Sequence, residues 1–296
     1  MHRPPSLPPL RRSVLFFPAD RPERYEKAVA SGADSVCCDL EDAVMPDAKD
    51  QARQKAVTLL ANRAPSSTEL ILRVNTPKSP AGLRDLLALL EGGAPADAVM
   101  IPKITSPAEV SWVDGLLGPA FPHLQLIPMI ETAAALAAAA EIVRASPRVS
   151  GVLMGGVDLS TELGSTREWE SLLYARSRMV HAAAQAAIAI VDMPYLDVAD
   201  VDGLARETAA VRRLGFTGRT AIHPSQVPVI HRAFAPTDDE LRRAREMIAA
   251  YDRQRGGVLL LDGKLVERPV ILAAQRTLAI ADAIAARGDG SGSGNR

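Results

Sequence analysis

Two carboxylates at the ends of neighbouring apolar segments are the residues of this chain best suited to chemistry. Glu131 follows the segment 124–130, and Asp158 follows the segment 151–157. If both segments are parallel strands of one sheet, the two side chains could bind one hard divalent cation. Mg²⁺ typically takes one or two protein carboxylates and completes its octahedron with water and substrate oxygens. Such a metal acts as a Lewis acid and stabilises the enolate that forms when a carbon–carbon bond breaks.

Other polar residues that could take part in catalysis also lie at or near the ends of apolar segments. Glu41 and Asp42 could hold the waters of the metal and orient its ligands. Arg73 offers a planar guanidinium fork for a substrate carboxylate. The main-chain N–H groups near the second carboxylate could also approach an anion closely, and they belong to Gly155, Gly156 and Val157.

Structural roles compete with these chemical ones. Arg73 could instead pair with Glu41 or Glu131 and stabilise the fold, and Lys103 could contact the substrate or form a structural ion pair. Asp39 could cap the loop that follows its strand, and Glu131 and Asp158 could cap helices. His223, in the sequence IHPSQ, is more often a hydrogen-bonded structural histidine than a base.

Eight apolar segments place these residues, and they are SVLFFPA (13–19), DSVCCDL (34–40), ELILRVN (69–75), DAVMIPKI (97–104), LQLIPMI (124–130), GVLMGGV (151–157), AIAIVDM (187–193) and TAIHP (220–224). Most are near-continuous apolar runs, which is typical of parallel strands that are buried on both faces. Helical patterns follow each of them. Eight strand–helix units in about 210 residues predict a (β/α)8 TIM barrel, in which chemistry lies at the carboxyl ends of the strands. A doubly wound open sheet is the alternative, but no glycine-rich dinucleotide or phosphate loop follows any segment.

The barrel is expected to form a single domain over residues 11–287, with a C-terminal helical extension from about 236 to 287. The ends, 1–10 and 288–296, are rich in Pro or in Gly and Ser, so we expect them to be disordered.

Composition limits the class of protein. Hydrophobic residues make up 47% of the 296 residues, charged residues 23%, and the formal net charge is −1. These values are typical of a soluble globular protein, and they indicate neither a nucleic-acid surface nor a membrane surface. Cys37 and Cys38 are adjacent in an apolar run, so we expect two buried thiols and no disulfide. The N-terminus lacks the apolar core of a signal peptide, and we expect no stretch to span a bilayer, so we expect a cytoplasmic protein.

Several segments together resemble a known family. They are SVLFFPADRPERYEKAVASGADSVCCDLEDAV, LRVN, MIPKI, IET, GVDL, GFTGRTAIHPSQ and LDGKLVERP, in this order between about Arg12 and about Ala285. The chain resembles the citrate lyase β-subunit-like branch of the HpcH/HpaI aldolase superfamily, which includes malyl-CoA and citramalyl-CoA lyases.

The resemblance implies a (β/α)8 barrel assembled as a homotrimer or hexamer, with Mg²⁺ held by Glu131 and Asp158. It also implies that Arg73 binds the substrate carboxylate and that Glu41 and Asp42 lie beside the metal waters. A histidine occupies the position of Asp42 in related pyruvate aldolases, so the resemblance argues against a histidine-based mechanism. The CoA-thioester substrates of the family imply that a further set of residues borders the nucleotide, namely Pro18, Arg21, Arg24 and the loop after Lys103.

One departure from the family pattern concerns proton transfer. Members that act on malyl-CoA-type substrates usually carry an Asp near the C-terminus that reaches into the site of a neighbouring subunit. Glu267 stands there in this chain, which keeps the charge and lengthens the arm by one methylene. Proton transfer is sensitive to such a displacement. Asp262 is the alternative donor.

The resulting hypothesis is Mg²⁺-dependent cleavage of a 3-hydroxyacyl-CoA thioester to an acyl-CoA and a small 2-keto acid. Citramalyl-CoA, malyl-CoA and citryl thioesters are the candidate substrates. The alternatives are a malyl-CoA-type thioesterase, a citrate lyase β subunit that acts on an acyl-carrier-protein thioester, and a non-enzymatic barrel that binds no metal.

Overall fold

The computed structural model describes residues 7–254, 258–261 and 263–290. The chain divides into two compact units, which we call the barrel unit (Arg11–Phe234) and the C-terminal unit (7–10 with 235–290). Residues 1–6 and 291–296 of the predicted disordered ends, and the alternative proton donor Asp262, lie outside the described residues.

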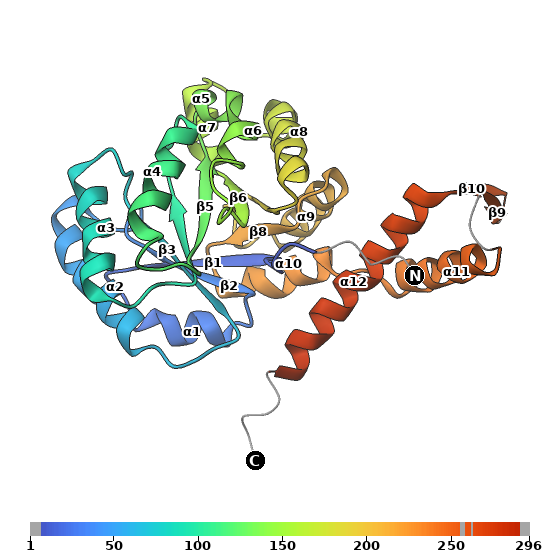
Figure 1. Cartoon of the computed structure of the whole chain (residues 1–296), viewed down its shortest axis with the longest axis horizontal. Helices are drawn as coiled ribbons and strands as arrows, with labels where there is room; N and C mark the ends of the chain where they lie inside the picture. Colours follow the sequence, from blue (N-terminus) through green and yellow to red (C-terminus); the bar gives the residue numbers. More distant parts are fainter. Residues whose placement is uncertain (1–6, 255–257, 262, 291–296) are drawn as a thin grey trace, which may run out of the picture. The chain divides into compact units, whose positions relative to one another are not determined.

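Eight parallel strands close into a barrel in sequence order, with β1 paired to both β2 and β8 (Figure 1). The strands are β1 (Ser13–Pro18), β2 (Ser35–Asp39), β3 (Glu69–Arg73), β4 (Ala98–Ile101), β5 (Gln125–Ile130), β6 (Gly151–Met154), β7 (Ala189–Asp192) and β8 (Gly218–Ala221). The helices of this unit are α1 (Arg24–Ala30), η1 (Pro46–Ala48), α2 (Lys49–Asn62), α3 (Pro80–Gly92), α4 (Pro107–Leu117), α5 (Ala133–Ala137), α6 (Ala139–Ile142), α7 (Gly156–Glu162), α8 (Trp169–Ala186), α9 (Val201–Leu214), η2 (Pro224–Gln226) and α10 (Val227–Phe234). The predicted TIM barrel is confirmed.

The eighth strand differs from its predicted range of 220–224. It begins two residues earlier, at Gly218, where a Cβ atom would lie 1.8 Å from the carbonyl oxygen of Arg11. Only glycine allows the main chain at position 218 to lie so close to the main chain of Arg11. The strand ends at Ala221, and Pro224 begins η2, so His223 lies in the following turn and caps that short helix.

Alternate strand residues fill the inside of the barrel. Cys37 belongs to the interior cluster, together with Ile71 and Met100 from the next two strands. Cys38 belongs to the layer between strands and helices. Both thiols are free and buried, as predicted.

An arginine closes the amino-terminal end of the barrel. The Arg11 guanidinium is 1% exposed and donates to Glu69 at 2.6 and 2.7 Å, to Gln125 at 2.7 Å and to the Ser150 hydroxyl at 2.8 Å. These partners stand at or just before the first residues of three different strands. A buried charge is stable only when it is paired and hydrogen-bonded in this way. The opposite end is therefore the one that remains open for chemistry.

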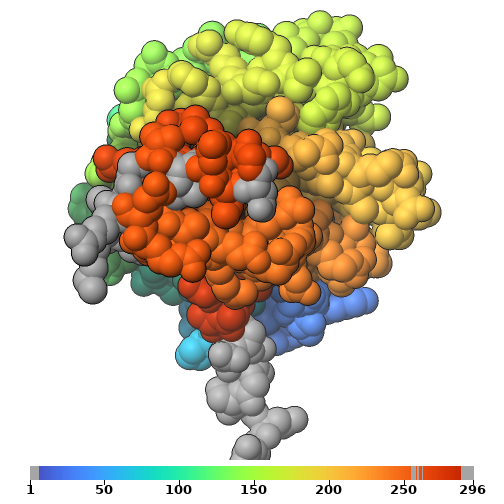
Figure 2. Space-filling view, turned by 90° about the vertical axis from the view of Figure 1, so that its right-hand side faces the viewer, coloured from blue at the N-terminus to red at the C-terminus, as the bar shows by residue number. Residues whose placement is uncertain are grey.

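Helices form the outer layer of the barrel unit. Figure 2 shows α8 in yellow and α9 in gold over neighbouring parts of one face. The buried residues of α9 include Leu204, Thr208 and Val211, at the spacing of one helical face.

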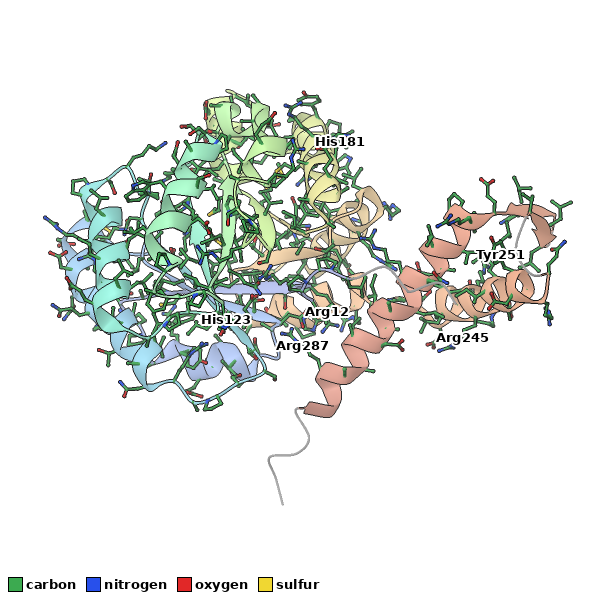
Figure 3. The ribbon with its side chains drawn as sticks, viewed as in Figure 1. Arg12, His123, His181, Arg245, Tyr251 and Arg287 are labelled. Carbon is green, nitrogen blue, oxygen red and sulfur yellow. The ribbon has the colours of Figure 1, made fainter. Side chains whose placement is uncertain are left out.

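The C-terminal unit is helical, as predicted. It consists of α11 (Asp238–Arg253), a hairpin of β9 (Leu259–Leu261) and β10 (Lys264–Val266), and α12 (Arg268–Gly290). Thr237 and Glu240 form a capping box at the start of α11. Tyr251 of α11, labelled in Figure 3, packs in a small cluster around Val266 and Ile271. Helix α12 runs to Gly290, three residues past the predicted boundary.

Helix α12 has a property that bears on the expected absence of a membrane span. Its segment Arg268–Arg287 is long and apolar enough to cross a membrane by length and composition, and 11% of that window is buried. A single helix of this kind is weak evidence, because helices of soluble proteins pass the same test. The absence of a membrane segment therefore stays a prediction.

Candidate active site at the carboxyl end of the barrel

A cavity of about 380 Å³ opens at the carboxyl ends of the strands. Its polar lining comes from five different strand ends: Asp39, Asp42, Arg73, Glu131, Gly155, Gly156, Val157, Asp158 and Thr220. Its apolar wall is formed by Phe16, Met129, Leu153, Pro194 and Ile222, among others. The structure thus brings most of the predicted site residues into one concave place.

The two predicted metal ligands lie next to each other. Glu131 directly follows β5 and is 2% exposed, and Asp158 lies in the first turn of α7. Burial raises the pKa of Glu131 to about 8, and the charge of Glu41 and a side-chain hydrogen bond to Asp158 act in the same direction. Adjacent carboxyl groups of this kind are hard oxygen donors whose negative charge a divalent cation would neutralise.

The donor set fits Mg²⁺ or a similar hard cation. No group of three or more His, Cys, Asp or Glu side chains arranged to hold a metal occurs in the described part of the chain. A closed protein cage of the zinc type is therefore not present among these residues. A pair of hard oxygen ligands beside an open cavity suits an ion that keeps waters and binds substrate oxygens.

Glycine is required at position 155 because Glu131 packs against its main chain. A Cβ atom there would lie 2.3 Å from the Cβ and 2.8 Å from Oε2 of Glu131. At position 156 the added atom would lie 2.3 Å from the sulfur of Met193. The Gly155–Gly156 pair thus lets Glu131 reach the cavity alongside the start of α7.

Substituting alanine for Gly155 is expected to displace Glu131 and to lower the free energy of unfolding by about 1–3 kcal/mol, the usual cost of overpacking. Gly115→Ala in α4 is the control, because a Cβ atom at Gly115 meets nothing within 4 Å. Urea denaturation of both variants measures the effect. Equal stability of the two variants would contradict the close packing of Glu131 on Gly155.

Arg73, at the end of β3, is held by three carboxylates. Its Nε and Nη2 donate to the two oxygens of Asp39 at 2.7 and 2.6 Å. Its Nη1 lies 3.0 Å from Glu41 and 3.5 Å from Asp42, and its guanidinium carbon lies 5.1 Å from the centre of the Phe16 ring. The pairing with Glu41 was one of the alternatives left open by the sequence. The contact of Arg73 with a substrate carboxylate stays a prediction. Nη1 is the guanidinium nitrogen that donates no hydrogen bond to Asp39.

The loop after β2 is shaped by the same aspartate. Asp39 accepts hydrogen bonds from the main-chain N–H groups of Glu41 and Ala43 at 2.9 and 3.0 Å, which is the capping role considered for it. Lys49 donates to the carbonyl oxygens of Leu40 and Glu41 at 2.6 and 2.5 Å. The pKa of Glu41 is raised by burial, against the opposing effects of Arg73 and Lys103. The loop is therefore held with its two acidic side chains beside the cavity.

Lys103 lies at the rim and does not line the cavity. Its ammonium group is 2.9 Å from Glu41 and 3.3 Å from Asp42, and its main-chain N–H donates to Glu131. The structural ion pair anticipated as an alternative is thus present.

Other predicted residues lie outside the cavity lining. Pro18 ends β1, and Arg21 and Arg24 are exposed in the turn and first residue of α1 that follow it. Glu267 belongs to the C-terminal unit, where it is exposed at the start of α12. Their roles toward a nucleotide and a neighbouring subunit stay predictions.

Asp192, at the end of β7, and His223, in the turn after β8, are held by structural contacts. Asp192 is 0% exposed and pairs with Arg176 at 3.2 Å and with Arg219 at 3.5 Å. His223 bonds Ser225 at 2.7 Å. His123 and His181 are exposed on the outside of the barrel (Figure 3), so no histidine lines the described cavity.

Sequence reasoning missed two contributors to the site. Phe16 forms one wall and stacks on Arg73, and Lys49 holds the main chain of the acidic loop. Phe16 could have been found from the alternation along β1, because it stands two residues from Val14 in the interior cluster. No sequence signal identifies Lys49, whose partners are main-chain carbonyl groups.

Comparison with known proteins agrees with this geometry. The model of the HpcH/HpaI aldolase/citrate lyase family matches residues 12–224. A protein of Cereibacter sphaeroides named (3S)-malyl-CoA thioesterase is 40% identical over 93% of this chain and 96% of its own length. The mitochondrial citramalyl-CoA lyase of Homo sapiens is 32% identical over 93% of this chain and 86% of its own.

A solved structure supports the same assignment. The CitE protein of Mycobacterium tuberculosis, in complex with magnesium, acetoacetate and coenzyme A, superposes with a TM-score of 0.77 at 33% identity. The match covers 94% of this chain and 99% of CitE. The chain belongs to the HpcH/HpaI aldolase/citrate lyase family of enzymes.

Proposed function

We propose that this enzyme is a Mg²⁺-dependent carbon–carbon lyase that cleaves a 3-hydroxyacyl-CoA thioester to an acyl-CoA and a 2-keto acid. The observation that carries the proposal is the adjacent pair Glu131 and Asp158 in the cavity that also contains Arg73. The magnesium and coenzyme A in the CitE complex support the ligand classes.

Each polar group of the cavity would have a separate role in the reaction. Bound Mg²⁺ would polarise the keto-acid part of the substrate and stabilise negative charge on its oxygen. Nη1 of Arg73 would orient the carboxylate of that part, and Glu41 and Asp42 would accept hydrogen bonds from waters at the metal. In cleavage, a base takes the hydroxyl proton, the C–C bond breaks, and the electron pair passes to the acyl-CoA enolate, which then takes up a proton. Glu267 of a neighbouring subunit is our candidate for delivering that second proton.

The charges of the cavity favour a keto acid with one carboxylate. Four carboxylates line the described cavity, and Arg73 is the single cation among the lining residues. Mg²⁺ and Arg73 would neutralise one carboxylate of the keto acid. A second carboxylate on the substrate would lie against acidic side chains. The apolar wall beside them, including Met129 and Leu153, suits a methyl group. We therefore place citramalyl-CoA and malyl-CoA ahead of citryl thioesters.

A coupled assay tests the proposal. Purified enzyme is incubated with (S)- and (R)-citramalyl-CoA and with malyl-CoA, with Mg²⁺ or with EDTA, while keto acid and free thiol are both measured. Metal-dependent release of keto acid without free thiol is the expected result. No keto acid from any of these substrates would overturn the assignment to CoA esters.

A thioesterase is the second candidate, and the 40% identity with the malyl-CoA thioesterase favours it. The same cavity would then position a water against the thioester carbonyl. Free thiol released together with intact malate, and no keto acid, would establish this activity. A citrate lyase β subunit is the third candidate, and dependence on an acyl-carrier protein would identify it. A homotrimer or hexamer and a cytoplasmic location complete the proposal.

Magnesium affinity is expected to depend on pH through Glu131. The pKa of this residue is raised to about 8, so below that pH the cation must displace a proton. The apparent affinity should fall by about tenfold per pH unit as the pH drops below 8, with about one proton released per ion at pH 7. Without metal, the folded state holds this proton in a pH range where the unfolded state has lost it, so stability falls as pH rises from about 4.5 to 8.

Isothermal titration in buffers of different ionisation enthalpy measures the proton release. Glu131→Gln is the control, because it removes the titrating group. An affinity that is constant from pH 6 to 8.5 would contradict the prediction.

A further inference from the structure

We propose that Lys103 is a positioning residue that acts through two separate parts. Its left-handed main chain orients Glu131, and its ammonium group holds Glu41 and Asp42 together. The inference rests on the proposed metal site and deepens it, because it replaces a substrate contact by Lys103 with a role exerted through three carboxylates.

The main chain of Lys103 adopts an unusual conformation. Its φ is 53°, and among the described residues only Lys103 and Ala187 are non-glycine residues with positive φ. Ala187 caps the C-terminal end of α8, where a left-handed residue is common. Lys103 instead stands two residues after the end of β4. Strained residues of this kind persist where the surroundings determine them, and they concentrate at functional sites.

The left-handed turn aims the N–H group of Lys103 at Glu131, to which it donates through Oε1. The next residue repeats the connection, because the Thr132 hydroxyl donates to the carbonyl oxygen of Ile104 at 3.2 Å. The loops after β4 and β5 are thus joined at two consecutive residues. On its other side, Glu131 lies against the main chain of Gly155. The carboxylate of Glu131 is therefore clamped between two loops, and its Oε1 accepts a hydrogen bond from one of them.

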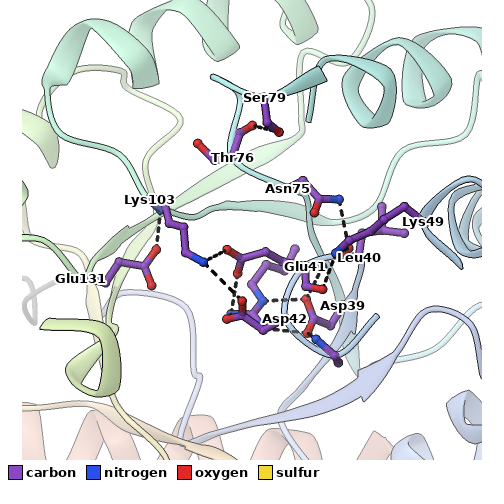
Figure 4. Close-up of polar contacts among 12 residues, drawn as sticks. Asp39, Leu40, Glu41, Asp42, Lys49, Asn75, Thr76, Ser79, Lys103 and Glu131 are labelled. Carbon is purple, nitrogen blue, oxygen red and sulfur yellow. Dashed lines mark hydrogen bonds and ion pairs between the residues drawn. The ribbon is translucent and has the colours of Figure 1, made fainter. Parts of the chain in front are cut away.

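The ammonium group of Lys103 points toward Glu41 and Asp42 (Figure 4). Together with Arg73, these residues form a ring of alternating charges. One oxygen of Glu41 is 2.9 Å from Lys103, and the other is 3.0 Å from Arg73. One oxygen of Asp42 is 3.3 Å from Lys103, and the other is 3.5 Å from Arg73. Each acidic residue is therefore shared between the same two cations. Removing Lys103 would leave half of each carboxylate without a cation, and the buried Glu41 would be freed to turn toward other donors.

A pair of variants isolates the main chain. Lys103→Gly and Lys103→Val both lack the ammonium group, but glycine adopts positive φ readily and valine does so at high cost. The difference between their affinities for Mg²⁺ therefore reports the main-chain conformation alone. We expect Lys103→Val to bind Mg²⁺ about tenfold more weakly than Lys103→Gly, through loss of the left-handed conformation. Isothermal titration on the full chain gives both values, and equal affinities would overturn the role of the main chain.

A second pair isolates the ammonium group. Lys103→Met removes the charge and keeps an unbranched side chain, and Lys103→Arg restores a cation. For Lys103→Met we expect kcat to fall about tenfold with KM for the thioester unchanged, the pattern of a lost interaction that is not substrate binding. Lys103→Arg should recover most of kcat. A raised KM with unchanged kcat in Lys103→Met would instead show a direct substrate contact and would overturn this part.

A measurement without metal or substrate separates this inference from the proposed function. In EDTA, the amide of Lys103 should exchange with solvent deuterium more slowly in the wild type than in Glu131→Ala. Equal exchange would overturn the clamp even if the enzyme proved to be a lyase. Slow exchange in a protein that binds no Mg²⁺ would keep the clamp and refute the proposed metal site.

Discussion

Replacing Glu131 with glutamine or Asp158 with asparagine is expected to lower kcat/KM by about 10³-fold, the contribution of a metal that stabilises developing charge. Each substitution removes half of the carboxylate pair at the cavity while preserving shape and hydrogen-bonding size. The stabilisation of the fold by Mg²⁺ should disappear at the same time, because a ligand that binds only the folded state raises its stability. Thermal unfolding with and without Mg²⁺, together with the keto-acid assay, measures both effects.

Glu131→Gln should not lower the stability of the metal-free protein. Burial and the neighbouring charge of Glu41 oppose ionisation of Glu131, so its pKa is raised. Glutamine relieves this cost at pH 8, and Glu131→Gln should unfold in EDTA at the same temperature as the wild type or higher. A site that is strained for function commonly behaves in this way.

Glu69→Gln is the matched control, because Glu69 is a partly buried carboxylate at the opposite end of the barrel, paired with Arg11 at 2.6 Å. It should lose stability and retain Mg²⁺ binding. If Glu131→Gln responded to Mg²⁺ as the wild type does, the metal site would have to be sought elsewhere.

Replacing Arg73 with methionine is expected to have the largest effect on stability, about 3–5 kcal/mol, the usual consequence of breaking one side of a buried ion pair. Asp39 is 1% exposed and receives two hydrogen bonds from Arg73, so it would be left as an uncompensated buried charge. Activity should be lost as well, because Glu41 and Asp42 would lose one of their two cations. Arg73→Lys keeps the charge without the fork, and it should fold with a smaller loss of stability. Urea denaturation and the keto-acid assay measure the two effects.

Arg12→Met separates stability from activity. Arg12, like Arg73, is 8% exposed and bonds both oxygens of an aspartate, Asp34, at 2.8 and 2.9 Å. It stands at the start of β1, at the amino-terminal end of the barrel. We expect a comparable loss of stability with kcat and Mg²⁺ affinity retained by the folded enzyme. If Arg12→Met and Arg73→Met impaired kcat equally in folded protein, Arg73 would have no role beyond folding.

Several features of the fold could be predicted from local sequence. Continuous apolar runs such as ELILRVN indicate strands buried on both faces, and eight of them in alternation with helices indicate a closed barrel. The position of Glu131 and Asp158 at the ends of two runs predicts that both lie at one end of that barrel. The last strand was misplaced by two residues, because its start depends on the close approach of Gly218 to Arg11, a residue about two hundred positions away in sequence.

The sequence by itself determined the barrel, the end at which ionisable residues gather, and the family. Only the tertiary structure decided which of these residues are bound to one another. Arg73 meets Asp39 because the register of β2 and β3 sets them side by side, whereas Asp192 is enclosed by arginines from α8 and β8. The left-handed turn at Lys103 and the raised pKa of Glu131 likewise arise from packing between loops that are distant in sequence. Local patterns report the period of each strand, but pairing and burial depend on the register and closure of the whole barrel.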